Sequence, residues 1–173
     1  MGIFNNFVAD SKKSEKGQIM IKFIGEYDSK LDEKGRAVVP SAFKAIVSKE
    51  LSKENLSDIS FVIKKSLFAN CLEMYTYEQW EQESEQIKAR LNFFNPEHDK
   101  FWREYSRERA FVTLDQKVGR IIIPKSLLTK IGVKKEIVFA GNDFKIEIWA
   151  KEKYAKTKMK ESEFVNLATK ILG

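Results

Sequence analysis

An internal repeat constrains the folding of this 173-residue chain more than any other feature. Residues 31–43 read LDEKGRAVVPSAF, and residues 114–127 read LDQKVGRIIIPKSL. In both segments Leu-Asp-X-Lys precedes Gly-Arg, three apolar residues and a proline. Two of the chain's three prolines, Pro40 and Pro124, occupy this equivalent place. The recurrence predicts a duplicated structural module.

The correspondence continues downstream of both prolines. Phe61-Val62-Ile63 matches Ile137-Val138-Phe139, CLEMY at 71–75 matches KIEIW at 145–149, and Trp80 matches Tyr154. Several matches in the same order make chance a poor explanation. Modules of about 50 residues are marginal alone. We therefore expect the two halves to bury their apolar faces against each other as an intrachain pseudo-dimer, which also hides strand edges.

Each copy is expected to begin with a β-hairpin. In the first copy, strands over 23–31 and 36–39 flank the turn Asp32–Gly35, where glycine suits the positive φ of a tight turn. In the second copy, 111–114 and 120–123 take the same roles. Proline cannot donate to a strand ladder and is accepted at the start of a helix, so short helices are expected over 41–47 and 125–130. Two further strands and a helix complete each copy.

Helical segments separate and follow the two copies. Apolar residues at helical spacing predict helices over much of 78–108, with aromatic side chains that pack in a core or an interface. A last helix, about 160–172, carries Phe164, Leu167, Ala168 and Ile171 on one side, which suits either the core or a subunit contact. The expected organisation is an N-terminal extension (1–19), a first module (20–80), connecting helices (81–110), a second module (111–155) and a C-terminal helix (156–173).

Side chains suited to catalysis or metal binding are scarce. Cys71 and His98 are the only cysteine and histidine, which excludes an intrachain disulfide and disfavours a metal site. Cys71 lies in an apolar run and is interpreted as a core residue, and His98 as part of a helix start. The sequence has no Gly-rich phosphate loop and no apolar run of about 18 residues. We therefore expect no enzyme activity, cofactor, metal, small-molecule substrate or membrane span. The net charge of +6 permits an anionic partner without requiring one.

The repeated motif has two possible roles. Asp32 can accept hydrogen bonds from turn amides or pair with Arg36, which would stabilise the turn. Alternatively, Lys34 and Arg36 can project outward and contact the phosphates or bases of DNA. Spacing alone leaves both roles open. Five lysines nearer the C-terminus are interpreted as a solvated face or as further phosphate contacts: Lys145, Lys151, Lys153, Lys156 and Lys158.

The two motifs, with A-V-V-P and I-I-I-P after them and K-I-E-I-W near the end, resemble the MraZ family over about residues 20–155. The resemblance implies a mainly β fold with added helices, in which tandem AbrB-like swapped-hairpin modules form an intrachain pseudo-two-fold, double-psi-like β-barrel. It also implies a cytoplasmic, nucleoid-associated transcriptional regulator of the bacterial division and cell-wall gene cluster, with repression as the expected effect. Such a regulator binds promoter direct repeats in double-stranded DNA as a ring-shaped homo-oligomer.

The resemblance assigns roles to the motif residues. The DNA-contacting positions are Lys34, Arg36, Lys117 and Arg120, and the turn-shaping positions are Asp32, Gly35, Asp115 and Gly119. Val118 is an extra residue in the second motif. One inserted residue enlarges a turn or reverses a strand face unless a bulge absorbs it, so the first motif is the firmer prediction.

Other functions stay open at this stage. An antitoxin-like regulator would carry one hairpin per chain, and the duplication argues against it. An oligomeric scaffold would bind a protein partner through the aromatic helices of 78–108. A hidden carboxylate pair would make an enzyme, because related barrels can host active sites.

Overall fold

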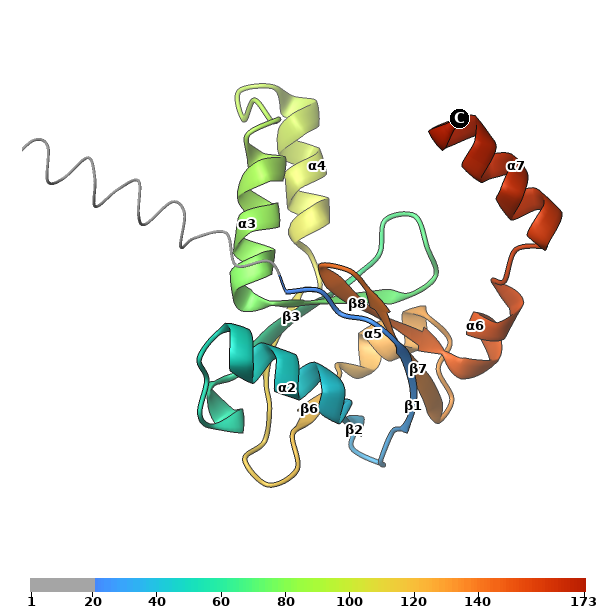
Figure 1. Ribbon diagram of the computed structural model, residues 1–173. Coiled ribbons are helices and arrows are strands. Elements are labelled where there is room, and N and C mark those ends of the chain that lie inside the picture. The colour runs from blue at the N-terminus through green and yellow to red at the C-terminus, as the bar shows by residue number, and fades with distance from the viewer. Residues whose placement is uncertain (1–20) are drawn as a thin grey trace, which may run out of the picture.

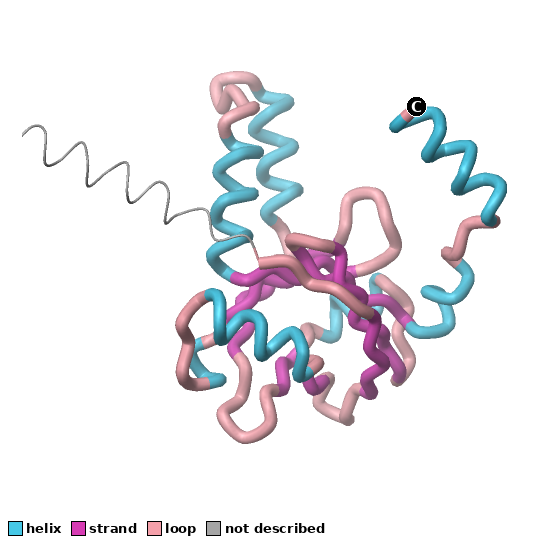
Figure 2. The backbone as a smooth tube through the Cα atoms, viewed as in Figure 1, coloured by secondary structure: helices cyan, strands magenta, loops and turns pink. Residues whose placement is uncertain are grey.

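The computed structural model describes residues 21–173, so the extension expected at 1–19 lies outside the described residues. The strands are β1 (Glu26–Lys30), β2 (Arg36–Val38), β3 (Ser60–Lys65), β4 (Leu72–Thr76), β5 (Ala110–Thr113), β6 (Arg120–Ile122), β7 (Glu136–Asn142) and β8 (Lys145–Ala150). The helices are α2 (Ser41–Glu50), α3 (Tyr77–Lys88), α4 (Pro96–Ser106), α5 (Lys125–Lys130), α6 (Lys151–Lys156) and α7 (Glu161–Leu172), with a 3-10 turn η1 (Leu56–Asp58). Figures 1 and 2 show their arrangement.

The strands form one sheet and one separate ribbon. Six strands are ordered β1-β7-β8-β4-β3-β5, and among residues 21–173 β2 pairs only with β6. All of these pairings are antiparallel. The mainly β, tandem architecture is confirmed. The expected β-barrel is not closed by hydrogen bonds among the described strands, because β1 and β5 are the two open edges of the six-stranded sheet.

The strands on either side of each turn pair with the other copy of the repeat. β1 pairs with β7, β5 pairs with β3, and β2 pairs with β6. The local hairpin pairing expected within each copy is therefore wrong. At the turn the chain passes from the sheet to the ribbon, so the two flanking strands belong to different layers. This exchange is the swapped arrangement that the family resemblance implied.

A pseudo-two-fold axis relates the copies and can be located from the strand register. Ala37 pairs with Ile121 at the centre of the ribbon, and these residues are equivalent in the repeat. Glu73 pairs with Glu147 where β4 meets β8, and these are equivalent too. Each self-matching pair marks a point where the axis crosses a strand pair. The duplication in sequence therefore produces a symmetric fold of the chain around one core.

The core lies between the sheet, the ribbon, α2 and α5. The sheet contributes Phe61, Ile63, Ile137 and Phe139, the ribbon contributes Ala37 and Ile121, and the helices contribute Phe43, Val47 and Leu127, all at most 1% exposed. Cys71 is also buried, in a smaller cluster with Val138, Ala140 and Trp149. Its interpretation as a core residue is confirmed.

Helices α3 and α4 project together from one end of the body (Figure 1). The guanidinium of Arg109 packs against aromatic rings of both helices. It lies 5.4 Å from the Trp80 ring, 5.3 Å from Trp102 and 4.7 Å from Tyr105. These aromatics pack internally, as expected. His98 lies in the first turn of α4, where its Nδ1 accepts a hydrogen bond from the backbone of Asn92.

Helix α7 stands away from the sheet (Figure 1) and contains no buried residue. Phe164 is 61% exposed and Ile171 is 70% exposed. The possibility that this helix packs in the core of its own chain is therefore wrong, because residues 157–160 lead it away from the body. Its possible use as a subunit contact stays a prediction.

Candidate nucleic-acid interface

The β2–β6 ribbon presents two arginines on its outer face. Because side chains alternate along a strand, burial of Ala37 and Ile121 turns their neighbours outward. The outward residues are Arg36, Val38, Arg120 and Ile122, with Arg36 opposite Ile122 and Arg120 opposite Val38. The arginine side chains are 31% and 29% exposed, so neither lies in the interior. The repeat thus places both predicted arginines on one small surface.

Asp32 organises the first turn. Its carboxylate accepts hydrogen bonds from the backbone N–H groups of Lys34 (2.9 Å) and Arg36 (2.8 Å), and from Nε of Arg36 (2.6 Å). Gly35 adopts φ of +75°, which L-residues rarely adopt. The bond from the Arg36 backbone, with help from its guanidinium, lowers the pKa of Asp32. The structural role proposed for this aspartate is therefore present in the turn.

Asp115 organises the second turn in the same way, despite the inserted residue. It accepts from the backbone of Lys117, Val118 and Arg120, each at 2.9 Å, and from Nε of Arg120 at 2.8 Å. These bonds, led by the one from Val118, hold the pKa of Asp115 well below its usual range. The insertion enlarges the turn without reversing a face of β6. Arg120 keeps the relation to Asp115 that Arg36 has to Asp32.

Lys44 compensates for the enlarged turn. Its Nζ donates to the carbonyl of Val118 at 2.8 Å. In the other half of the molecule the equivalent position is Leu128, whose side chain packs near Gly35. A lysine therefore satisfies the additional backbone carbonyl at the second turn, and a leucine suffices at the smaller first turn. Spacing of the motif alone did not identify Lys44.

Both arginines are oriented and remain available. Each uses Nε for its aspartate, and within residues 21–173 neither guanidinium forms a hydrogen bond through its terminal nitrogens. Lys34 and Lys117 are exposed at the turns. The arrangement can present two planar, forked donors from a rigid support to an acceptor that approaches the outer face.

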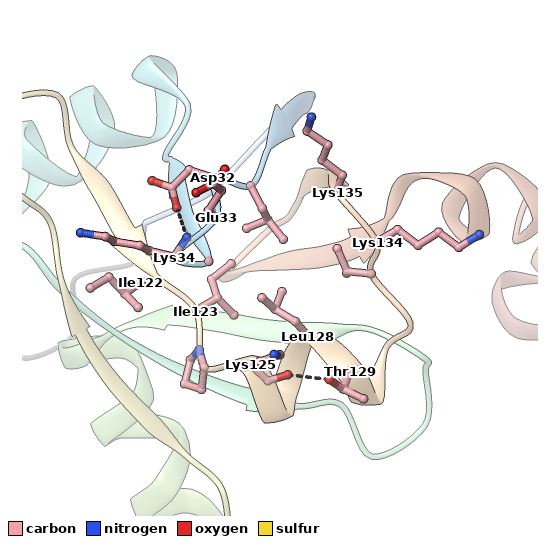
Figure 3. A pocket seen from close by; sticks show the side chains of 14 residues that line it. Asp32, Glu33, Lys34, Ile122, Ile123, Lys125, Leu128, Thr129, Lys134 and Lys135 are labelled. Atoms are coloured by element: carbon pink, nitrogen blue, oxygen red, sulfur yellow. Dashed lines mark hydrogen bonds between the residues drawn. The ribbon is translucent and has the colours of Figure 1, made fainter.

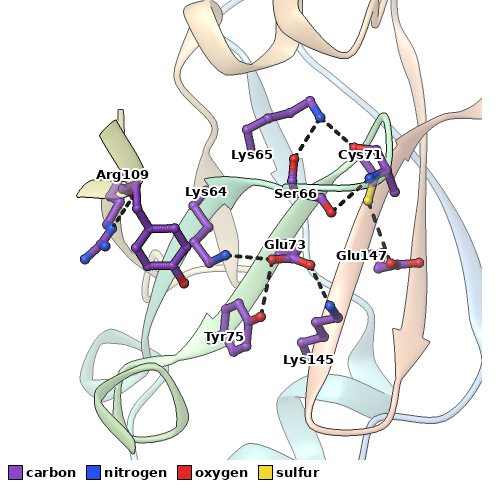
Figure 4. Close-up of polar contacts among 11 residues, drawn as sticks. Lys64, Lys65, Ser66, Cys71, Glu73, Tyr75, Arg109, Lys145 and Glu147 are labelled. Atoms are coloured by element: carbon purple, nitrogen blue, oxygen red, sulfur yellow. Dashed lines mark hydrogen bonds and ion pairs between the residues drawn. The ribbon is translucent and has the colours of Figure 1, made fainter. Parts of the chain in front are cut away.

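Side chains from β3, β4 and β8 form a second polar cluster (Figure 4). Glu73 accepts from Lys64 at 2.8 Å and from Lys145 at 2.5 Å, and the Tyr75 hydroxyl lies 3.3 Å from the same carboxylate. Burial alone would raise the pKa of Glu73, but the hydrogen bonds and charges of the two lysines hold it below its ordinary value. The single carboxylate is held by two ammonium groups, which suits a structural role better than proton transfer.

Two of the five C-terminal lysines are engaged within the chain. Lys145 pairs with Glu73, and Lys151 pairs with Asp28 at 3.1 Å. Burial raises the pKa of Cys71 to about 12, with a further contribution from Glu147, so its thiol is protonated at neutral pH. In the described part of the chain, no three His, Cys, Asp or Glu side chains gather as metal ligands. Nor does any helix among residues 21–173 have the length and apolar character to cross a membrane.

Comparison with known proteins gives one consistent family. A family model described as "MraZ protein, putative antitoxin-like" matches residues 22–104 and 107–171. Proteins named Transcriptional regulator MraZ are similar over most of the chain. The one from Christiangramia forsetii is 38% identical over 155 residues, covering 89% of this chain and 95% of that protein. The one from Bacteroides fragilis is 35% identical over 145 residues, covering 84% and 87%. The one from Clostridium acetobutylicum is 36% identical over 132 residues, covering 76% and 84%.

Proposed function

Because the chain belongs to the MraZ family, we propose that it is a transcriptional regulator that binds double-stranded DNA through the outer face of the β2–β6 ribbon. The observation that carries this proposal is the pair of oriented arginines, Arg36 and Arg120, on that face. The names of the relatives supply the regulatory role, and the ribbon supplies a surface suited to it.

The ribbon has suitable dimensions and chemistry for a groove. The major groove, about 12 Å wide, admits a two-stranded ribbon, and arginine reads guanine through paired donors. Diagonal positions across an antiparallel pair lie roughly 7–8 Å apart, close to two base steps of about 3.4 Å. Arg36 and Arg120 would thus contact bases about two steps apart. Val38 and Ile122 occupy the other diagonal of the same face and can contact thymine methyl groups.

Lys34 and Lys117 are assigned to phosphates, because an ammonium on a turn is a mobile point charge. The four turn residues Asp32, Gly35, Asp115 and Gly119 are assigned to shaping the turns that hold the arginines. One ribbon neutralises few phosphates, so a single subunit would bind weakly and with strong salt dependence.

The proposal includes assembly. We infer a ring of subunits that engages promoter direct repeats of the division and cell-wall gene cluster and represses it, in association with the nucleoid. Linking several ribbons would raise affinity by roughly 10²–10⁴ where subunit spacing matches repeat spacing. In this function the chain acts without catalysis, cofactor or small-molecule substrate.

The experiment is a titration of a duplex carrying the direct repeats, against a scrambled duplex of equal length. Arg36→Ala should weaken binding to the repeat duplex by roughly 5- to 150-fold, the range for one bidentate base contact. Arg36→Lys should retain part of the affinity for both duplexes and lose selectivity, since lysine lacks the fork.

A matched control is available on α4. Arg103 forms an i,i+4 pair with Asp99 at 2.5 Å, as Arg36 does with Asp32, but it lies on the projecting helices. Arg103→Ala should leave binding unchanged, and light scattering should show the same assembly for every variant. Equal affinity of wild type and Arg36→Ala for the repeat duplex would refute the proposed interface.

A further inference from the structure

The two ends of the ribbon are related by the pseudo-two-fold axis in backbone but differ in charge. At the first-turn end, four exposed lysines line a pocket of about 490 Å³: Lys34, Lys125, Lys134 and Lys135 (Figure 3). Ile122, from the outer face of the ribbon, lines the same pocket. Within residues 21–173 none of these four ammonium groups forms an ion pair or a hydrogen bond, so their charges are uncompensated by direct contact. We call this set the lysine cluster.

The second-turn end lacks this cluster. Two equivalent backbone hydrogen bonds, one at each end, show which residues replace Lys134 and Lys135 there. Leu31 donates its N–H to the carbonyl of Lys135 at 2.8 Å, and Leu114 donates to the carbonyl of Ile59 at 3.1 Å. Ile59, which is buried, therefore occupies the place of Lys135, and Asp58 that of Lys134. The repeat alignment likewise places Ser41 at the position of Lys125.

The other cations of the second-turn end are partly committed. Lys117 is exposed like its equivalent Lys34, but Lys44 donates to the Val118 carbonyl, and Lys53 pairs with Glu78 at 3.8 Å. At the first-turn end, the acidic residues facing the pocket are Asp32, whose charge is matched by Arg36, and the exposed Glu33. The first-turn end is therefore the more positive of the two.

We propose that the lysine cluster binds the phosphodiester backbone beside the groove and so gives the ribbon one polarity on DNA. This inference rests on the proposed function, in which the outer face of β2–β6 enters a groove. Ile122 belongs both to that face and to the pocket wall, so DNA seated against the face brings its backbone to the cluster. A ribbon with equal ends would bind in both orientations, whereas phosphate contacts at one end favour a single orientation. A direct repeat requires successive subunits to point the same way.

The first test is the salt dependence of binding. Each lost phosphate contact should reduce the slope of log Kd against log salt by about 1. Lys134→Gln/Lys135→Gln should therefore lower the slope by about 2 for each subunit engaged on the duplex, and weaken binding to the repeat and scrambled duplexes alike. A control with equal charge loss is Arg90→Gln/Lys100→Gln, at exposed positions of the α3–α4 projection. This control should keep the wild-type slope.

The second test measures polarity. An iron chelate can be attached through Glu33→Cys at one end, or through its repeat equivalent Gln116→Cys at the other, which leaves the lysine cluster intact. The buried thiol of Cys71 will not compete. The two reagents should cleave opposite flanks of each repeat, one flank per reagent. Cleavage of both flanks by each reagent would overturn the inferred polarity.

The outcomes separate this inference from the function on which it rests. Suppose that Lys134→Gln/Lys135→Gln keeps the wild-type salt slope while Arg36→Ala loses selectivity. That result would refute a role of the lysine cluster in DNA binding and would still support the ribbon as the interface. Retained selectivity in Arg36→Ala would instead remove the ribbon itself.

Discussion

The buried charge cluster allows a quantitative prediction for Glu73→Gln. Glu73 and Lys64 have side chains only 8% and 6% exposed, and Lys145 is 17% exposed. The substitution keeps the shape of the side chain but removes the negative charge between two ammonium groups. The substitution affects Lys64 most. Burial alone would lower the pKa of Lys64, but the hydrogen bond and charge of Glu73 raise it.

The expected loss of stability is about 3 kcal/mol. Removing one partner of a buried ion pair costs about 3–5 kcal/mol, because the remaining charge is desolvated and uncompensated. We take the lower end since Lys145, which is more exposed, can turn toward solvent. With a urea dependence of about 2 kcal/mol per M, the unfolding midpoint should fall by roughly 1.5 M.

The assay is equilibrium unfolding in urea at one fixed protein concentration, because oligomerisation contributes to apparent stability. The matched control is Glu85→Gln, whose pair with Lys88 is exposed on α3. It should change stability by less than about 1 kcal/mol. The double variant Lys64→Met/Glu73→Met should recover much of the loss, since apolar replacements leave no unpaired charge at these two positions. A Glu73→Gln protein within 1 kcal/mol of wild type would refute the reasoning that this cluster is desolvated and interdependent.

Three further predictions concern the turns and the thiol. Deleting Val118 should destabilise the protein less when Lys44→Leu is also present, because the pair recreates the first-turn geometry; additive losses in a double-mutant cycle by urea unfolding would contradict this. Native Cys71 should resist a thiol reagent at pH 8 and react on unfolding, because its pKa is about 12; rapid labelling of the native protein would argue against its burial. The folded pKa values of Asp32 and Asp115 lie below the unfolded value near 4. The two carboxylates therefore add to the free energy of unfolding above pH 4, and this stabilisation is lost as pH falls through the folded pKa values. Thermal melts from pH 7 to pH 2 should show that loss, and Asp115→Asn should reduce it; an unchanged acid profile in that variant would exclude Asp115 as a cause.

Much of the local structure was predictable because its causes are local. Helices after Pro40 and Pro124 follow from the backbone chemistry of proline, and they appear at 41–50 and 125–130. The positive φ at Gly35 and Gly119 follows from the tight turns in which they lie. The burial of Cys71 follows from its apolar setting.

The candidate site was predictable in part. The motif identified Arg36 and Arg120, because the repeat singles out both positions. The motif did not identify Lys134 and Lys135. These lysines are far in sequence from the first turn, and the pairing of β1 with β7 brings them close to it. A comparison of the two copies, with Asp58 in place of Lys134, is the signal that could have drawn attention to them.

The sequence by itself determined that there would be two equivalent halves, each with a tight Asp-to-Arg turn followed by a helix. Turn geometry and proline stereochemistry depend on neighbouring residues, so they can be read from a short segment. Only the tertiary structure decided that the strands flanking each turn join different layers, and that Lys44 stabilises a turn 74 residues away. Those outcomes depend on which distant surfaces bury the most apolar area together, and that competition involves the whole chain at once.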